Sequence, residues 1–281
     1  MISIKSAQDI ILHQTSAMET ESVPLLQGIG RIIAQEMRAP HDLPLSNNSA
    51  MDGYALAVRP DREHWNVVDF IPAGTLRTSP VCPGDAVKIM TGAPVPEGCD
   101  TVVPIEDVIV EAGIIKLVHS VKHGSHVRKR GEDLLAGSLV IKSGTPVRPQ
   151  DIGLLASLGW AELPVYRKPR VAVLATGDEL LEVGTAPCPG KIINSNSYSL
   201  AAQLLQAGGE PVLIGIAADT REATREKIAE GMQLDALIIS GGASVGDRDY
   251  VSEAIQELQG ELYFSKVNMK PGKPATFATI D

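Results

Sequence analysis

The sequence predicts a multidomain protein of the α/β plus β class. A three-layer α/β/α domain with a mostly parallel sheet is expected to follow a mixed N-terminal domain that carries a β-rich insert. The chain has 281 residues, and single hydrophobic cores stop growing near roughly 250 residues, so two or three domains are expected. Only 4% of the residues are aromatic, whereas 26 are Gly and 19 are Pro. This composition indicates aliphatic cores and frequent turns.

The mixed N-terminal domain is predicted to combine residues 1–41 with residues 149–168. Ser6, followed by Asp9 and an apolar pair, predicts a capped helix that runs to about Met18. A second helix-sized apolar segment begins at Pro149 and is ended by Gly159. The extended stretch that follows it is expected to rejoin the N-terminal layer.

Residues 42–148 are predicted to form the β-rich inserted domain. Gly, Pro, Asn and Asp interrupt this region every several positions and separate short apolar runs, which are VVDFI, AVKIM, TVVPIEDVIV and GIIKLVHSV. Short strands bounded by turn residues are typical of an all-β unit.

Residues 169–281 are predicted to form the α/β/α domain. After the linker RKPR, apolar strands alternate with helices predicted across residues 197–206, 221–232 and 250–258. Continuous apolar strands between amphipathic helices indicate a mostly parallel sheet that is covered on both faces. Ligands bind such sheets beyond the carboxyl ends of the strands, where we expect the loops 176–180, 217–221, 240–250 and 268–274.

Charge and cysteine usage exclude several classes of function. A net charge of −9 argues against a general nucleic-acid binder and against an electrostatic membrane anchor. The three cysteines are far apart and form no CxxC pair, so neither a zinc knuckle nor a disulfide framework is expected. The sequence shows no signal peptide and no apolar stretch of membrane-spanning length. We therefore expect a soluble, cytoplasmic protein.

The stretch from Ala236 to Tyr250, ALIISGGASVGDRDY, places paired glycines between an apolar strand and a helix. Glycines let the backbone approach a ligand closely, and the first N–H groups of a helix favour anions. The stretch is therefore read either as an anion cradle or as a plain strand-to-helix turn.

Acidic and basic residues gather in the predicted loops at the strand ends. They are Asp178, Glu179, Asp219, Asp247, Asp249, Lys266, Lys270 and Lys273. Carboxylates of this kind hold Mg²⁺ and leave positions for substrate phosphate, while lysines contact anionic oxygens. The alternative is that Asp178, Asp219 and Asp249 are helix caps. The loop KPGKP, which fixes two lysines between prolines, favours a function.

Six separated motifs resemble those of the molybdopterin molybdenumtransferases, the MoeA family, which includes the E domain of gephyrin. The motifs are SAMDGYA (49–55), TGAPVPEGCDTVVP (91–104), RGEDL (130–134), ATGDEL (175–180), SGGASVGDRDY (240–250) and KPGKP (270–274). The resemblance implies Mg²⁺-dependent insertion of molybdate into adenylylated molybdopterin, with release of AMP and molybdenum cofactor. It also implies a molybdopterin-binding α/β/α domain and a homodimer whose site lies between two subunits.

The resemblance assigns roles to individual positions. Catalytic roles fall to Glu179, Asp219, Asp249, Asp52, Lys266 and Lys270, and metal binding to Asp178, Glu179, Asp219 and Asp249. Contacts with the pterin substrate fall to Thr91, Asp133, Thr176, Gly177, Ser240, Gly241, Gly242, Ser244, Gly246 and Lys273. Asp52 and Thr91 match positions on the partner's side of the cleft.

Two departures from the family pattern stand out. Asn47 occupies a position where the family usually has aspartate, so a charge is replaced by an amide of the same shape. Family members also continue beyond KPGKP through a further strand and a C-terminal β-domain, whereas this sequence stops at Asp281. The resemblance therefore predicts a chain that lacks the C-terminal part, with impaired activity.

Two other functions remain open from the sequence. One is the adenylyltransferase that prepares the pterin substrate, which has a similar sheet fold and is also a possible partner. Its glycine loop resembles GGTG, whereas this chain has GGASVG. Formation of adenylylated pterin from ATP by this chain would favour the adenylyltransferase. A non-catalytic scaffold is the other alternative, and a stoichiometric protein partner without pterin affinity would favour that function. The sequence does not decide between molybdate and tungstate.

Overall fold

The computed structural model describes residues 1–241 and 250–280. Contacts within the chain divide it into two compact units. The first contains residues 1–34, 146–148 and 162–281, and the second contains residues 35–145 and 149–161. None of the helices in the described ranges is long and apolar enough to cross a lipid bilayer. The predicted domain boundaries differ in detail from these units and stay a prediction.

The second unit is built around a six-stranded sheet in the order β7-β4-β6-β5-β9-β8. Its strands are antiparallel except for the parallel pair β5 and β6. They are β4 (Gly53–Leu56), β5 (His64–Ile71), β6 (Asp85–Ile89), β7 (Thr101–Pro104), β8 (Val108–Glu111) and β9 (Ile114–Leu117). All of them lie within the region that was predicted to be β-rich.

Both faces of this sheet are covered by apolar side chains. Successive residues of a strand point to opposite faces, and accordingly Ala55 packs in one buried cluster with Val87 and Ile89, while Leu56 packs in another with Trp65. Shorter elements complete the unit. They are β2 (Met37–Arg38), β3 (Asn48–Ser49), β10 (Val127–Arg128), β11 (Leu139–Ile141), the 3₁₀ turn η2 (Ile105–Asp107) and α2 (Pro149–Ser157).

The first unit begins with α1 (Ile4–Gln14), whose boundaries correct the predicted helix. Ser3, not Ser6, is the N-cap, because the extended Ser3 places its hydroxyl to accept the Ser6 N–H at 3.0 Å. Beyond α1 the chain forms β1 (Thr20–Pro24), which pairs antiparallel with β12 (Glu162–Tyr166), and the 3₁₀ turn η1 (Leu25–Gly28). The extended stretch after α2 thus rejoins the N-terminal layer, as predicted.

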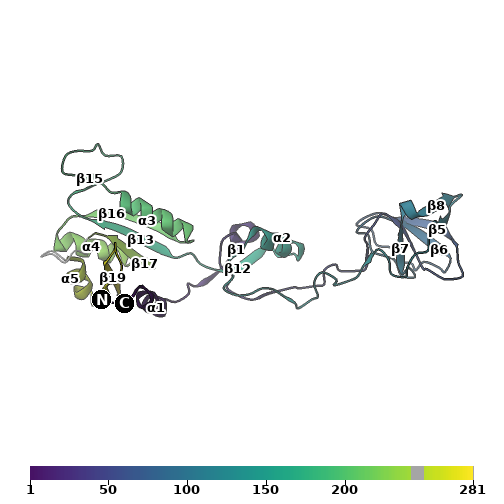
Figure 1. The fold of residues 1–281 in the computed structure, drawn as a ribbon, viewed down its shortest axis with the longest axis horizontal. Coiled ribbons are helices and arrows are strands. Elements are labelled where there is room, and N and C mark those ends of the chain that lie inside the picture. Colours follow the sequence, from purple (N-terminus) through teal and green to yellow (C-terminus); the bar gives the residue numbers. More distant parts are fainter. Residues whose placement is uncertain (242–249, 281) are drawn as a thin grey trace. The chain divides into compact units, whose positions relative to one another are not determined.

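The α/β part of the first unit contains the parallel sheet β16-β13-β17. Its elements are β13 (Arg170–Thr176), α3 (Ser195–Gln206), β16 (Glu210–Ala217), α4 (Arg221–Gly231), β17 (Ala236–Ser240) and α5 (Tyr250–Glu257). Figure 1 shows α3 on one side of the sheet and α4 and α5 on the other. Ala172 and Leu174 of β13 pack in one buried cluster with Ile228 of α4 and Ala254 of α5. The predicted three-layer architecture is confirmed.

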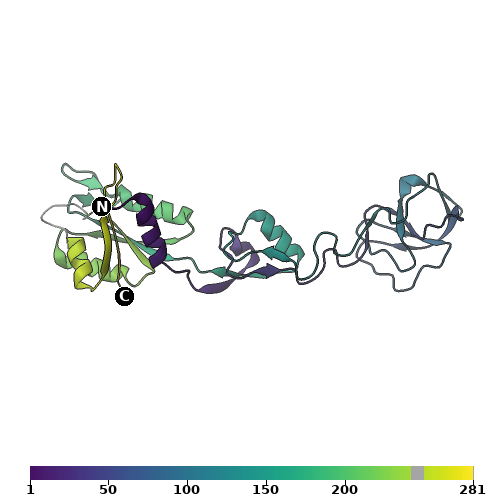
Figure 2. The same ribbon diagram turned by 60° about the horizontal axis from the view of Figure 1, so that its bottom comes forward.

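The segment ELYFSKV differs from its expected place in the parallel sheet. In the described part of the chain, β18 (Glu261–Lys266) pairs antiparallel with β19 (Pro274–Thr279) and with no other named strand. The loop between them is far too short for a parallel crossover, so a hairpin is the only connection that pairs these strands. Figures 1 and 2 both show α1 beside this hairpin, and Ile2 forms a bridge with Val267. The small pair β14 (Leu180–Leu181) and β15 (Ile192–Ile193) precedes α3.

Candidate functional site

The carboxyl ends of three strands meet at one edge of the parallel sheet. Thr176, the last residue of β13, is in register with Ala217 at the end of β16, and Ala175 is in register with Ser240 at the end of β17. Parallel register makes all three following loops leave the same edge. The loops predicted at 176–180, 217–221 and after Ser240 therefore begin side by side, and we call this the sheet edge.

Asp178 and Asp219 bind each other's loops at the sheet edge. The Asp219 N–H donates to the Asp178 carboxylate at 3.1 Å, and the Asp178 N–H donates to the Asp219 carboxylate at 3.3 Å. Neither aspartate is a helix cap: Thr220 caps α4 by accepting the Ala223 N–H, and Asp178 precedes the strand β14. The alternative reading of these two acids as caps is therefore wrong. Each carboxylate keeps acceptor positions for a further partner.

Glu179 lies beside Gly177 in the turn that leaves β13. Gly177 has a φ of +144°, and a Cβ at this position would collide with the Glu179 carboxylate. Glycine therefore lets the exposed Glu179 fold back over the end of the strand. Within the described ranges, no group of three or more His, Cys, Asp or Glu side chains is arranged to hold a metal ion. A metal at this edge would need oxygens in addition to those of the described side chains.

Thr176 and Gly241 are in close contact where β13 and β17 end. Thr176 is 7% exposed, and its Oγ1 bonds no residue that the structure describes. A Cβ on Gly241 would lie 2.6 Å from the Thr176 carbonyl oxygen and 2.8 Å from Oγ1, and Gly241 has a φ of +104°. Only glycine fits this close approach.

Sequence reasoning missed Asn196 at the sheet edge. The predicted helix begins at residue 197, whereas α3 begins at Ser195 and is capped by Asn194. Asn196 therefore lies in the first turn, where its Nδ2 donates to Ser240 Oγ at 3.2 Å. The string NSNS before an apolar helical pattern is a cap signal that could have placed the helix start correctly.

The predicted basic loop belongs to the β18–β19 hairpin. Lys266 ends β18, Lys270 and Lys273 lie in the connecting loop, and all three are exposed. Among the residues that the structure describes, none of the three lysine side chains forms an ion pair or a hydrogen bond. Their place beside Asp178, Glu179 and Asp219 stays a prediction.

Several predicted site residues lie outside the described ranges. They are Gly242, Ser244, Gly246, Asp247 and Asp249. Their assigned roles in phosphate and metal binding stay predictions.

In the second unit, the motifs around residues 47–56 and 91–100 are joined by hydrogen bonds. Asp52 Oδ1 accepts both the backbone N–H and the hydroxyl of Thr91, each at 2.7 Å. These two bonds, the backbone bond first, hold the pKa of Asp52 below its usual range. Gly53 follows directly, and a Cβ there would collide with the Val103 carbonyl oxygen. The structure therefore brings the candidates Asp52 and Thr91 together.

Charged residues of the motif RGEDL (130–134) form ion pairs within the second unit. Asp133 binds Arg128, and this bond with its charge raises the pKa of the Arg128 guanidinium. Arg130 binds Asp42 at 2.5 Å. Asn47, the residue that departs from the family pattern, accepts the Arg130 N–H through Oδ1 at 2.9 Å. An amide thus performs here the acceptor function that a carboxylate also has.

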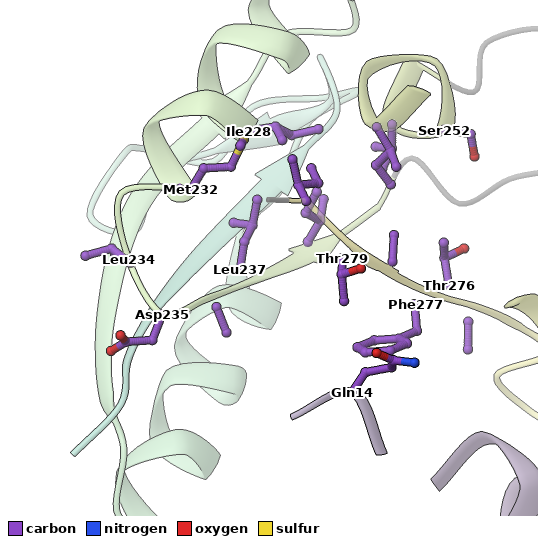
Figure 3. A pocket seen from close by; sticks show the side chains of 18 of the residues that line it. Gln14, Ile228, Met232, Leu234, Asp235, Leu237, Ser252, Thr276, Phe277 and Thr279 are labelled. Carbon is purple, nitrogen blue, oxygen red and sulfur yellow. The ribbon is translucent and has the colours of Figure 1, made fainter. Parts of the chain in front are cut away.

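A cavity of about 540 Å³ lies in the first unit (Figure 3). Its walls include Ile228 of α4, Met232 directly after this helix, Leu237 of β17 and Phe277 of β19. Of the predicted site residues in the described part of the chain, only Gly241 lines it. Polar residues such as Asp235 and Thr279 also line it, but none of the described lining residues is a Lys or Arg that could neutralise a phosphate, so we do not place a phosphate group in this cavity.

The comparisons with known proteins cover almost the entire chain. Residues 2–159 match the family described as the MoeA N-terminal region (domain I and II), and residues 172–280 match a probable molybdopterin binding domain. The molybdopterin molybdenumtransferase of Nostoc sp. is 38% identical over 100% of this chain and 67% of its own length. The corresponding protein of Bacillus subtilis is 37% identical over 99% of this chain and 67% of its own length.

A solved structure agrees with these sequence matches. The molybdopterin biosynthesis MoeA protein of Pyrococcus horikosii has a TM-score of 0.89 and 30% identity, over 100% of this chain and 72% of that chain. These matches cover both the unit that contains the sheet edge and the unit that contains the Asp52–Thr91 contact, and they show the family. The chain belongs to the molybdopterin molybdenumtransferase family, a family of transferases.

Proposed function

We propose that this protein acts in molybdenum cofactor biosynthesis as the transferase that inserts molybdate into adenylylated molybdopterin, releasing AMP and molybdenum cofactor. The observation that carries the proposal is the sheet edge, where Asp178, Asp219 and Glu179 lie next to Thr176 and the backbone of Gly241. Acidic oxygens beside hydroxyl and amide donors suit a phosphate-bearing ligand that brings a cation with it. Family membership supplies the pterin as its organic part.

The acids of the sheet edge fit Mg²⁺ in chemistry. They offer oxygen only, and Mg²⁺ is commonly held by one or two carboxylates together with substrate phosphates and water. Because these three acids are not arranged as one metal-binding group, one or two of Asp178, Asp219 and Glu179 would hold the ion, with Asp249 as a further predicted acid. When bound, the ion would neutralise charge on the phosphate oxygens of the substrate.

The chain's own groups have separate roles in this proposal. Asp178 and Asp219 keep the two acidic loops at a fixed separation through their reciprocal hydrogen bonds. Glu179 orients the attacking water, because its carboxylate is exposed beside the strand end. Lys266, Lys270 and Lys273 contact oxyanions of the substrate, and Gly242, Ser244 and Gly246 contact its phosphate through the backbone.

We further propose that the active form is a homodimer in which Asp52, Thr91 and Asp133 of the partner subunit complete the site. The second unit then supplies a wall that is already held in shape by internal hydrogen bonds. We place this enzyme, as a soluble protein, in the cytoplasm, which agrees with the chain's negative charge and cysteine usage. An adenylyltransferase supplies its substrate.

The transferase activity is tested by in vitro molybdenum insertion with adenylylated molybdopterin, molybdate and Mg²⁺. We expect AMP release and cofactor formation by the unaltered chain, and loss of both in Glu179→Ala and Lys270→Ala. Normal insertion by both variants would refute the site. Formation of adenylylated pterin from ATP, without insertion, would instead identify an adenylyltransferase.

The shared site is tested by mixing two inactive variants, Glu179→Ala and Asp52→Ala. In a mixed dimer, one of the two sites combines an intact Glu179 with an intact Asp52 of the partner subunit. Full exchange at equal amounts should therefore recover about a quarter of the normal activity. No recovery, despite mixed dimers detected by native mass spectrometry, contradicts a site shared between subunits.

A further inference from the structure

Residues 267–273, which join β18 to β19 and are here called the basic loop, are held on one side by the N-terminal segment. The Ile2 N–H donates to the Lys266 carbonyl oxygen at 3.2 Å, and the Asn268 N–H donates to the Ile2 carbonyl oxygen at 2.8 Å. These two bonds form the parallel bridge between Ile2 and Val267. Ile2 thus acts as a one-residue strand at the base of the basic loop.

The hairpin holds the same residues from the other side. The Val267 N–H donates to the Lys273 carbonyl oxygen at 3.0 Å, and Lys266 is in register with Pro274. Residues 266–268 therefore bind Ile2 along one edge and Lys273 along the opposite edge. Val267, between the two, is only 3% exposed. The base of the basic loop is a short three-stranded arrangement, and it fixes the backbone of Lys266 and Lys273.

The bridge to Ile2 matters because the hairpin has little other support of this kind. Within the described ranges, β18 and β19 pair with each other and with no other named strand, and a two-stranded hairpin alone is only marginally stable in water. The hairpin also concentrates Lys266, Lys270 and Lys273, which are exposed and repel one another. Without the bridge, we expect the loop to populate several conformations.

Ile2 is a fixed support because α1 begins almost directly after it. Ser3 caps the helix by accepting the Ser6 N–H at 3.0 Å, and the Ser3 carbonyl oxygen accepts the Ala7 N–H, also at 3.0 Å. Ala7 is buried. Gln14, at the other end of α1, lines the same cavity as Phe277 of β19 (Figure 3). The helix is thus placed against the hairpin near both of its ends.

We propose that Ile2, held by α1, is a positioning residue that fixes the basic loop in the conformation in which its lysines receive anionic oxygens of the substrate. The inference rests on the proposed function in taking the phosphate-bearing pterin as the ligand of these lysines. It gives the N-terminal segment, to which the sequence assigned no part in binding, a role in substrate affinity. Loss of the bridge leaves every lysine present, but affinity falls with the fraction of loops in the competent conformation.

The decisive variant lacks Met1 and Ile2 and begins at Ser3, so that the cap of α1 is kept. The Asn268 N–H then loses its acceptor, whereas the Val267 N–H keeps Lys273. We expect hydrogen exchange of both amides to become about tenfold faster, while the amides of the buried strand β13 exchange at their normal rate. Molybdopterin should bind about tenfold more weakly in isothermal titration calorimetry.

Unchanged exchange at Val267, or unchanged affinity despite faster exchange, would overturn the positioning role. Equally faster exchange in β13 would also overturn it, because the loss would then be a general loss of stability. Ile2→Val is the matched control, since it keeps both backbone groups of the bridge and should bind molybdopterin normally. Weak binding by Ile2→Val would assign the effect to the side chain and contradict the role of the bridge.

Asn268→Pro tests the bridge from the side of the loop. Proline removes the N–H that donates to Ile2, and the N-terminal segment keeps its full length. We expect faster exchange at Val267 and weaker molybdopterin binding, as in the shortened chain. Normal exchange and normal affinity in Asn268→Pro would contradict the inference even if the shortened chain failed to fold.

These results are distinguishable from the proposed transferase activity. Exchange and binding are measured without molybdenum insertion, so Ile2-dependent molybdopterin binding in a chain that inserts no molybdenum would support this inference and refute the proposed function. Normal insertion by a chain whose pterin affinity does not depend on Ile2 would support the proposed function and overturn this inference.

Discussion

The acids of the two units differ in what they bind. In the second unit, Asp52 binds Thr91, Asp133 binds Arg128 and Asp42 binds Arg130. At the sheet edge of the first unit, Asp178 and Asp219 bind only backbone N–H groups among the described residues. Both sets hold loops in shape. In the second unit Asp133 and Asp42 each neutralise an arginine, and Asp52 binds a threonine. At the sheet edge, the carboxylates of Asp178 and Asp219 have neither a cation nor a side-chain donor among the described residues, so they are available to an external cation.

Glu179→Gln should show the largest effect on activity. Removal of the charge at the sheet edge should lower the rate of molybdenum insertion by about 10²-fold or more. The melting temperature should stay the same, because Glu179 is exposed and forms no ion pair within the described part. Glu182→Gln, also exposed and three positions further on, is the control and should keep normal activity. A fall in melting temperature would place Glu179 with the structural acids.

Gly241→Ala should lower both stability and pterin affinity. The added Cβ would lie 2.6 Å from the Thr176 carbonyl oxygen, so the strand ends must separate at a cost of about 2 kcal/mol. Gly184→Ala is the matched control, since Gly184 has a φ of +94° but nothing within 4 Å of the added atom. Urea unfolding of both variants separates the steric cost from the backbone cost. An equal loss in the free energy of unfolding in the two variants would show that the contact with Thr176 does not contribute to stability.

Asp52→Ala should lower stability as well as activity, in contrast to Glu179→Gln. The variant leaves the Thr91 N–H and hydroxyl without their shared acceptor, so the 91–100 loop should loosen. Asp52→Asn retains an acceptor oxygen and should restore most of the stability without the charge. Differential scanning calorimetry, with the exposed Asp61→Ala as control, measures the effect. A normal melting temperature in Asp52→Ala would break the distinction between the two groups of acids.

Asp235 offers a paired acid inside the first unit, with the smallest expected effect. Hydrogen bonds from Arg167, together with the Arg170 N–H, lower the pKa of Asp235 to about 2, against burial that raises it. A carboxyl whose pKa is lower in the folded chain binds fewer protons there, so its stabilisation is present above pH 3.8 and is lost as the pH falls toward 2.

We therefore expect Asp235→Asn to cost on the order of 1 kcal/mol at pH 7, a discounted value because the pair is partly exposed. The difference from the unaltered chain should shrink as the pH is lowered to 2, as measured by urea unfolding at several pH values. A difference that is the same at pH 7 and pH 2 would show that the ion pair does not stabilise the fold.

Sequence reasoning predicted the layers better than the details of the site. Apolar strands between amphipathic helices were sufficient for the parallel sheet, because such strands must be buried on both faces. The same reasoning placed ELYFSKV in that sheet, although a short loop commits β18 and β19 to an antiparallel hairpin. It also began α3 two residues late and so missed Asn196.

The sequence by itself determined which chemical groups are present at the strand ends and which family motifs carry them. Glycines, acids and hydroxyl residues occupy the turns because backbone geometry and strand direction are local properties of the chain. Only the tertiary structure decided which of these groups form hydrogen bonds with one another. The reciprocal bonds between Asp178 and Asp219 join residues 41 positions apart, and the bond from Asn196 to Ser240 spans 44. Partners so distant in sequence are selected by how the sheet and helices pack, which no local pattern records.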